Sequence, residues 1–255
     1  MRKIIIIASM SVLENSRKHI FHVICLLMLA IIAGSTLLTI LTEGVKIKIL
    51  KDLCMTSISF GGAMLAIALA SGAIPQDVES RIIYPVIARP VTRNQYLLGK
   101  FFGVLVTVTI GILVMTAIFS ALIFINQGTL DLFLFTAIAY LILQTAVIAG
   151  ATIMISTFTS SAIAALIAFL IFITGTIKIG YFGGLLNRMS DGFSKGILTI
   201  IYYMLPNLES FNLKDAFVHS EHIPMIYLLQ VGIYGILFTA FLLVVGSIVF
   251  SHKEV

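Results

Sequence analysis

Long apolar runs separated by short polar segments dominate the sequence. A helix of about 20 predominantly apolar residues is needed to cross the hydrocarbon core of a bilayer. Runs of this kind predict six membrane-spanning helices, at residues 20–42, 53–74, 97–125, 131–157, 161–181 and 225–250. The pattern predicts an all-α membrane protein with a single transmembrane domain, 1–255. An even number of spans places both termini on the same side.

Two further segments show helical spacing of apolar residues but are too polar to cross a membrane. Residues 1–19 are predicted to form an interfacial helix on the inner membrane surface. A disordered leader is the alternative, and a cleaved signal peptide is disfavoured because no small-residue cleavage site follows the short apolar run. In the extracytoplasmic segment 182–224, apolar residues recur every three or four positions from Leu185 to Met204. This spacing predicts an outer amphipathic helix followed by a loop.

Composition confirms the membrane class and the charges suggest an orientation. The chain is 60% hydrophobic and only 11% charged, whereas soluble domains are about 25% charged. If both termini are cytoplasmic, the inner segments hold nine basic and four acidic residues, and the outer segments hold seven of each. The positive-inside rule therefore favours cytoplasmic termini, and the net charge of +5 need not indicate nucleic acid.

The stretch IPQDVESRIIYPVIARPVTRNQYLLGK, beginning at Ile74, differs from the rest of the chain. Pro75 ends the second span, and Asp77 and Glu79 fit the first turn of a new helix. Thr92 and Gln95 form a capping box that predicts the next helix start near Arg93. Between them lies an apolar knob made of Ile82, Ile83, Tyr84, Val86 and Ile87. The segment 75–96 is either a rigid cytoplasmic coupling segment gripped by another protein or an ordinary inner loop resting on the membrane.

Catalytic motifs are missing from the sequence. No GxxxxGK[ST] phosphate loop is present, and neither HExxH nor GxSxG occurs. The spans contain few groups that could exchange ions, namely Gln144, His22 near an inner end and Lys178 near an outer end. This scarcity disfavours a self-powered pump and predicts that the chain is not an enzyme.

Several isolated polar groups are weaker candidates for a site. His219, Glu221 and His222 could hold a metal, but their spacing matches no strong template and a solvated outer loop is favoured. Cys25 and Cys54 share no redox or metal spacing and are interpreted as small apolar core residues. Substrate contact is conceivable at Gln144, Asn126 and the small residues of Ser160–Ala168, although close helix packing explains the small residues better.

The stretch after Ile74 resembles the signature of type-2 ABC-transporter permeases. The matching positions are Asp77, Glu79, Arg89, Pro90, Arg93, Tyr96, Gly99 and Lys100. LENSRKHIF, at residues 13–21, is similar to the entry helix of that family, and YYMLPNLESFNL, at residues 202–213, resembles its outer segment before the last span. The likeness is greatest for the branch with multi-copper enzyme and nitrous-oxide-reductase maturation permeases.

The resemblance implies a permease in a bacterial or archaeal cell membrane that works in export or does mechanical work on an outer partner. It implies two copies of the chain working with two separate ABC ATPase subunits, which would bind the ATP and Mg²⁺, and no cofactor on this chain. The implied ATPase-coupling surface consists of Asp77, Glu79, Arg81, Ile83, Tyr84, Arg89 and Arg93. A secondary transporter or channel, or a non-transporting anchor for extracytoplasmic partners, is the alternative.

Overall fold

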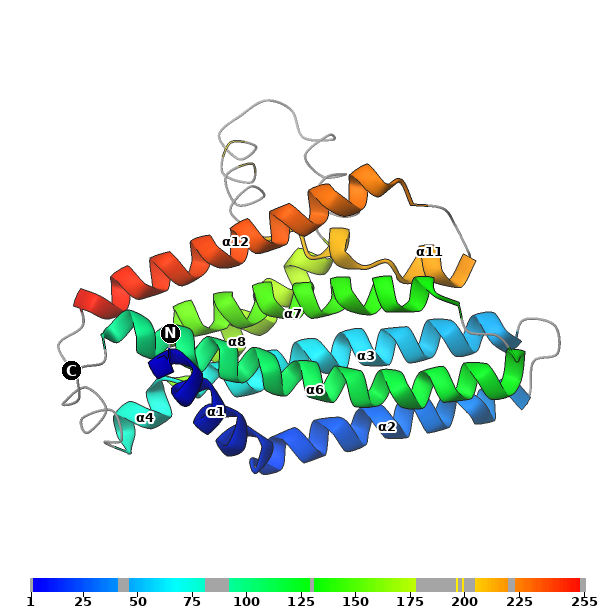
Figure 1. Cartoon of the computed structure of the whole chain (residues 1–255), viewed down its shortest axis with the longest axis horizontal. Coiled ribbons are helices and arrows are strands. Elements are labelled where there is room, and N and C mark those ends of the chain that lie inside the picture. The colour runs from blue at the N-terminus through cyan, green and yellow to red at the C-terminus, as the bar shows by residue number, and fades with distance from the viewer. Residues whose placement is uncertain are drawn as a thin grey trace.

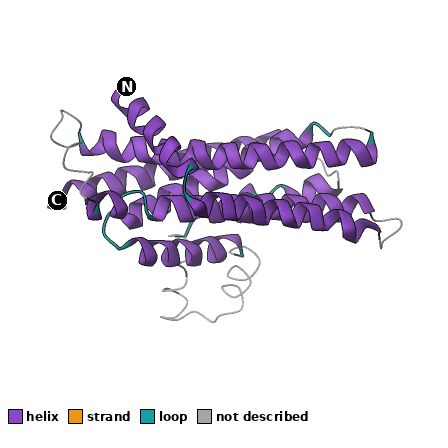
Figure 2. Ribbon diagram, turned by 90° about the horizontal axis from the view of Figure 1, so that it is seen from below, coloured by secondary structure: helices purple, strands orange, loops and turns teal. Residues whose placement is uncertain are grey.

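The computed structural model describes residues 2–40, 46–80, 92–128, 131–177, 196, 199, 205–219 and 223–252, and this part of the chain contains helices and no strand (Figure 2). In chain order, the first helices are α1 (Arg2–Ser16), α2 (His19–Ile40), α3 (Lys46–Ser71), α4 (Pro75–Glu79), α6 (Arg93–Gln127), α7 (Phe133–Ser156) and α8 (Ser161–Thr176). They are followed by the 3₁₀ turn η2 (Glu209–Phe211), α11 (Lys214–His219) and α12 (Met225–His252). The all-α prediction is confirmed.

Five of the described helical stretches are long and apolar enough to cross a membrane. They contain α2, α3 together with α4, α6, α7 and α12. Helix α8 has 16 residues, about 24 Å at 1.5 Å per residue, which is less than a hydrocarbon core of about 30 Å. The fifth predicted span, 161–181, continues past Ile177 into residues outside the described part, so the six-span layout stays a prediction.

Helix α3 begins at Lys46, inside a stretch that we expected to be a loop. Its early turns are anchored because Lys51 lies 3.7 Å from the Asp131 carboxylate and 4.6 Å from the centre of the Phe217 ring. Next to it, Lys214 of α11 pairs with Asp52 at 2.9 Å. These contacts tie α11 to the first turns of α3 at the end of the bundle opposite α4 (Figure 1).

The helices form one bundle with α7 at its centre. Helix α7 packs against α3, α6, α8 and α12, and α3 packs against both α2 and α8. Figure 1 shows α1, α4 and the last turns of α12 gathered at the same end of the bundle. The start of α1 and the end of α12 therefore lie at one end of the bundle.

Helix α1 packs across the first turns of α6. Two glycines of α6 lack side chains there, which lets the two helices approach closely. A Cβ atom on Gly99 would lie 2.7 Å from Cβ of Ile7, and one on Gly103 would collide with Ser11. On the other face of α1, Ile5 and Met10 are 66% exposed. The predicted interfacial helix therefore rests on protein along one side, and its outward face is apolar enough for lipid.

Replacing Gly103 with leucine should separate α1 from α6. Overpacking of this kind costs about 1–3 kcal/mol, which corresponds to a fall of roughly 2–12 °C in the melting temperature of a chain this long. Thermal unfolding in detergent measures the effect. Gly34→Leu is the matched control, since a Cβ at Gly34 meets nothing within 4 Å. Equal melting temperatures for the two variants would contradict the packing described here.

Candidate functional site

The short helix α4 follows the end of α3 after one turn and carries the predicted coupling acids Asp77 and Glu79. Helix α3 ends at Ser71, a turn follows, and Pro75 occupies the first turn of α4, where no backbone donor is needed. Asp77 also lies in this first turn, as predicted, and is buried, whereas Glu79 is exposed. One helical turn thus presents one acid to the interior and one to the outside.

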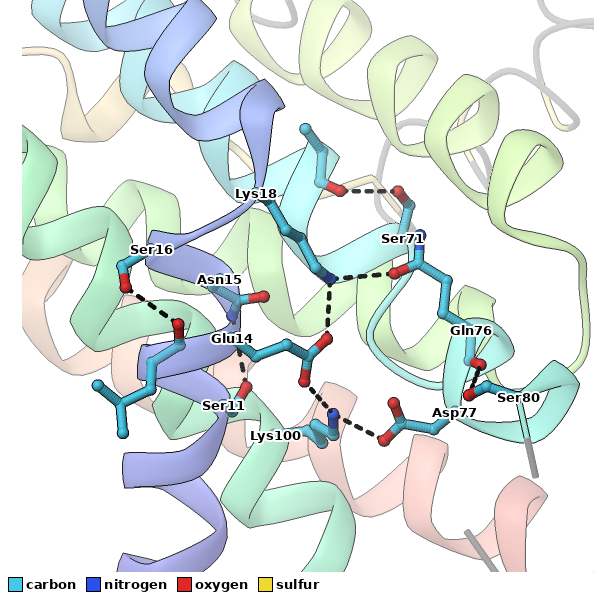
Figure 3. Close-up of polar contacts among 12 residues, drawn as sticks. Ser11, Glu14, Asn15, Ser16, Lys18, Ser71, Gln76, Asp77, Ser80 and Lys100 are labelled. Carbon is cyan, nitrogen blue, oxygen red and sulfur yellow. Dashed lines mark hydrogen bonds and ion pairs between the residues drawn. The ribbon is translucent and has the colours of Figure 1, made fainter. Parts of the chain in front are cut away.

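Two lysines connect α4 to α1 and α6 in a continuous polar network (Figure 3). Lys18 donates to the Gln76 amide oxygen at 3.0 Å and pairs with Glu14 at 3.1 Å. Glu14 also pairs with Lys100 at 3.2 Å, and Lys100 pairs with Asp77 at 2.7 Å. Because Gln76 and Asp77 are neighbours on α4, the network closes on that helix. We call these five residues the α4 clamp.

Two members of the α4 clamp, Asp77 and Lys100, are almost completely shielded from solvent. Asp77 is 5% exposed and Lys100 6% exposed. Tyr96, at 2% exposure, donates its hydroxyl proton to the same Asp77 carboxylate. Asp77 therefore has a cation and a hydroxyl as partners, which is how a buried charge is tolerated. The Asp77 carboxylate therefore faces the interior, and its part in the coupling surface stays a prediction.

The first turn of α6 also holds the end of α12. The predicted capping box is confirmed, with Thr92 accepting from the Gln95 backbone N–H and Gln95 from the Thr92 N–H. The Arg93 guanidinium donates to the carbonyl oxygens of Phe250 at 3.1 Å and Ser251 at 2.9 Å. A cation at these last carbonyls stabilises the negative end of the α12 dipole.

The structure brings together only part of the predicted coupling surface. Asp77 and Arg93 hold α4 and α12 in place, and Glu79 remains exposed at the end of α4. Four predicted members lie outside the described residues, namely Arg81, Ile83, Tyr84 and Arg89. The described residues Ser80 and Thr92 border this stretch on its two sides.

Sequence reasoning did not assign the remaining members of the α4 clamp to the site. Glu14 and Lys18 are separated from Lys100 by more than 80 positions, so nothing local joins them. Two signals were available. Tyr96 and Lys100 are four residues apart and share one face of α6, and the Gly99–Gly103 spacing is a close-packing motif that marks where α1 lies.

The charge of Glu14 makes the α4 clamp sensitive to acid. Partial burial acts to raise the pKa of Glu14, but the positive charges of Lys100 and Lys18 outweigh it and lower the pKa below its ordinary value of 4.5. A carboxylate whose pKa is lowered on folding contributes stability above its unfolded pKa and loses it as pH falls through the folded value. We expect the melting temperature of the wild type to fall below pH 4.5 more steeply than that of Glu14→Gln. Parallel acid profiles for the two proteins would contradict this.

The weaker candidates have structural surroundings. Gln144 is buried and donates to the carbonyl oxygen of Leu208 at 3.4 Å, which ties the residue just before η2 to α7. Asn126 donates to Leu122 of its own helix. Within the part of the chain that the structure covers, no group of three metal-ligating side chains occurs. His219 ends α11, while Glu221 and His222 lie outside the described residues.

The small residues and the cysteines also have structural surroundings. Ala164 and Ala168 of α8 are buried, and α8 packs on α3 and α7. Cys54 is buried and Cys25 half-buried, and both are free thiols. These small side chains pack against neighbouring helices, so we interpret them as packing residues.

Comparison with known proteins identifies the family. The family model described as "ABC-2 family transporter protein" matches residues 5–193. That range includes the α4 clamp, α6 and the stretch between α4 and α6, and it covers well over half of the 255 residues. No curated protein matches the chain. The multi-pass helical bundle and this match agree, and the chain belongs to the ABC-2 family of transporter proteins.

Proposed function

We propose that the chain is the permease subunit of an ABC exporter and that separate ATPase subunits dock on residues 74–93. Membership of the ABC-2 family supports the permease role and, in general, an ABC ATPase partner. The sequence has no phosphate loop, so ATP and Mg²⁺ would bind to the partner. Two ATPases, two copies of this chain, cytoplasmic termini and a bacterial or archaeal cell membrane belong to the same proposal.

The observation that carries the proposal is the closure of the α4 clamp on α4. Lys18 and Lys100 hold neighbouring residues of this helix, and Tyr96 adds a third contact. A force on the stretch that follows α4 would therefore reach α2 through Lys18 and α6 through Lys100. A loop that merely rested on the membrane would not need such an anchor.

The same anchor extends to the last helix. Arg93 joins the start of α6 to the end of α12, and the Ser247 hydroxyl donates to the side-chain oxygen of Asn94 at 2.5 Å. Lys18 and Lys100 thus connect α4 to the start of α2 and to α6, and α6 is in turn connected to α12. Movement of the docked ATPases on ATP binding would tilt these helices together and open or close a path along the apolar bundle.

Reconstitution of the chain with an ABC ATPase partner tests the function. We expect ATP hydrolysis by the partner to change when the permease is present, and the two proteins to purify together from detergent. Transport that needs only an ion gradient would replace the proposal with a secondary transporter or channel. Co-purification with extracytoplasmic proteins alone would favour a membrane anchor.

A further inference from the structure

A cavity of about 710 Å³ lies beside the α4 clamp, between α2, α3 and α8. It is found where α2 begins, α3 ends and α8 begins. Its lining includes Arg17, Lys18, Ser71, Gln76, Ser161 and Ala162. The lining therefore combines basic and hydroxyl groups with small apolar side chains, and it contains no acid.

The charge of this cavity is unbalanced. Lys18 is paired with Glu14, which also neutralises Lys100. Arg17 is exposed, and none of the described carboxylates lies within ion-pair distance of its guanidinium. An arginine offers five donors in a planar fork that suits a phosphate group. The electrostatics of the cavity therefore fit an anion, and the serine hydroxyls of α3 and α8 can add hydrogen bonds.

The surroundings of the cavity are apolar along the helices that lead away from it. Helix α3 packs on both α2 and α8 and so lies between them. Exposed apolar side chains follow on each of these helices, with Val23 62% exposed on α2, Phe60 45% on α3 and Leu166 63% on α8. A ligand with an anionic head and apolar chains would match both parts, whereas a free anion would match only the first.

We propose that this cavity, which we call the headgroup cavity, binds the phosphate headgroup of an anionic phospholipid, with its acyl chains along α2, α3 and α8. Lys18 and Gln76 belong both to the headgroup cavity and to the α4 clamp. A bound phosphate near Lys18 would compete with Glu14 and Gln76 for its ammonium group, so occupancy would alter how firmly α4 is held. The binding site itself does not depend on the proposed transport function.

The test uses the purified full chain, stripped of lipid in detergent, with dioleoyl phosphatidylglycerol as the probe. Binding is measured by native mass spectrometry and by the rise in melting temperature. Each basic residue near an anionic lipid strengthens binding about fivefold, so Arg17→Gln should weaken it about fivefold and Arg17→Glu roughly twenty-five-fold. Ala162→Phe, which fills space without changing charge, should also weaken binding.

Lys48→Gln is the matched control, because it removes one exposed basic residue at the opposite end of the bundle. We expect it to bind the lipid as the wild type does. Equal binding of dioleoyl phosphatidylcholine, or an equal loss in Lys48→Gln and Arg17→Gln, would overturn the proposal. Binding of glycerol phosphate as tight as that of the lipid would show a site for soluble phosphate and overturn the lipid assignment. Because the binding test contains no ATPase, none of these outcomes bears on the proposed transport function, which is tested separately.

Discussion

Lys100→Met should lower the free energy of unfolding by about 3–5 kcal/mol, the usual cost of removing one partner of a buried ion pair. Lys100 pairs with Asp77 and Glu14, and Asp77 is 5% exposed. Without the lysine, the Asp77 carboxylate would be buried without a cation. For a chain of this length the loss corresponds to a fall of roughly 6–20 °C in melting temperature, which thermal unfolding in detergent would measure.

Two controls make this result specific to the α4 clamp. Lys48→Met removes an exposed lysine at the opposite end and should leave the melting temperature nearly unchanged. The double variant Asp77→Asn/Lys100→Met removes both charges, and it should be more stable than the sum of the two single changes predicts. A melting temperature of Lys100→Met equal to that of the wild type would show that the Lys100–Asp77 pair does not hold α4.

Glu79→Lys should weaken the complex with the ATPase while leaving the permease folded. Glu79 is exposed at the end of α4, next to the stretch proposed to dock the partner. Placing like charges opposite each other at an interface costs several kcal/mol, so the amount of ATPase that purifies with the permease should fall at least about tenfold. The ATPase rate of the complex should fall in parallel.

The comparison with Asp77→Asn separates docking from anchoring. Asp77→Asn should lower the melting temperature of the isolated permease, because it removes the partner of a buried lysine. Glu79→Lys should leave that temperature unchanged, as should the charge reversal Lys48→Glu at the far end, which should also leave co-purification intact. Co-purification of the ATPase with Glu79→Lys at the wild-type level would exclude Glu79 from the interface.

The apolar runs predicted the helices of the fold because a bilayer restricts the backbone conformations that can cross it. Backbone groups in lipid must pair within their own helix, so each long apolar run becomes a helix. Local chemistry also set the start of α6, where the Thr92–Gln95 box forms as predicted. The start of α3 was placed too late because Lys46, Lys48 and Lys51 resemble a loop, and only the distant Asp131 and Phe217 show why Lys51 is accommodated in a helix.

The candidate site was predictable in position but not in detail. Pro75 and Asp77 marked the short helix α4. Which acid faces inward could not be inferred, since Asp77 and Glu79 are two residues apart and differ only in what packs against α4. That choice is made by Lys100 and by α1, whose position depends on the glycines of α6.

Site-specific photo-crosslinking tests the central claim most directly. A photoreactive amino acid is placed at position 79 or, as the control, at position 48, and the permease is expressed with a tagged ABC ATPase partner. Docking on α4 predicts a crosslink to the ATPase from position 79 and none from position 48, which lies at the other end of the bundle. A crosslink from position 48 without one from position 79 would contradict the account.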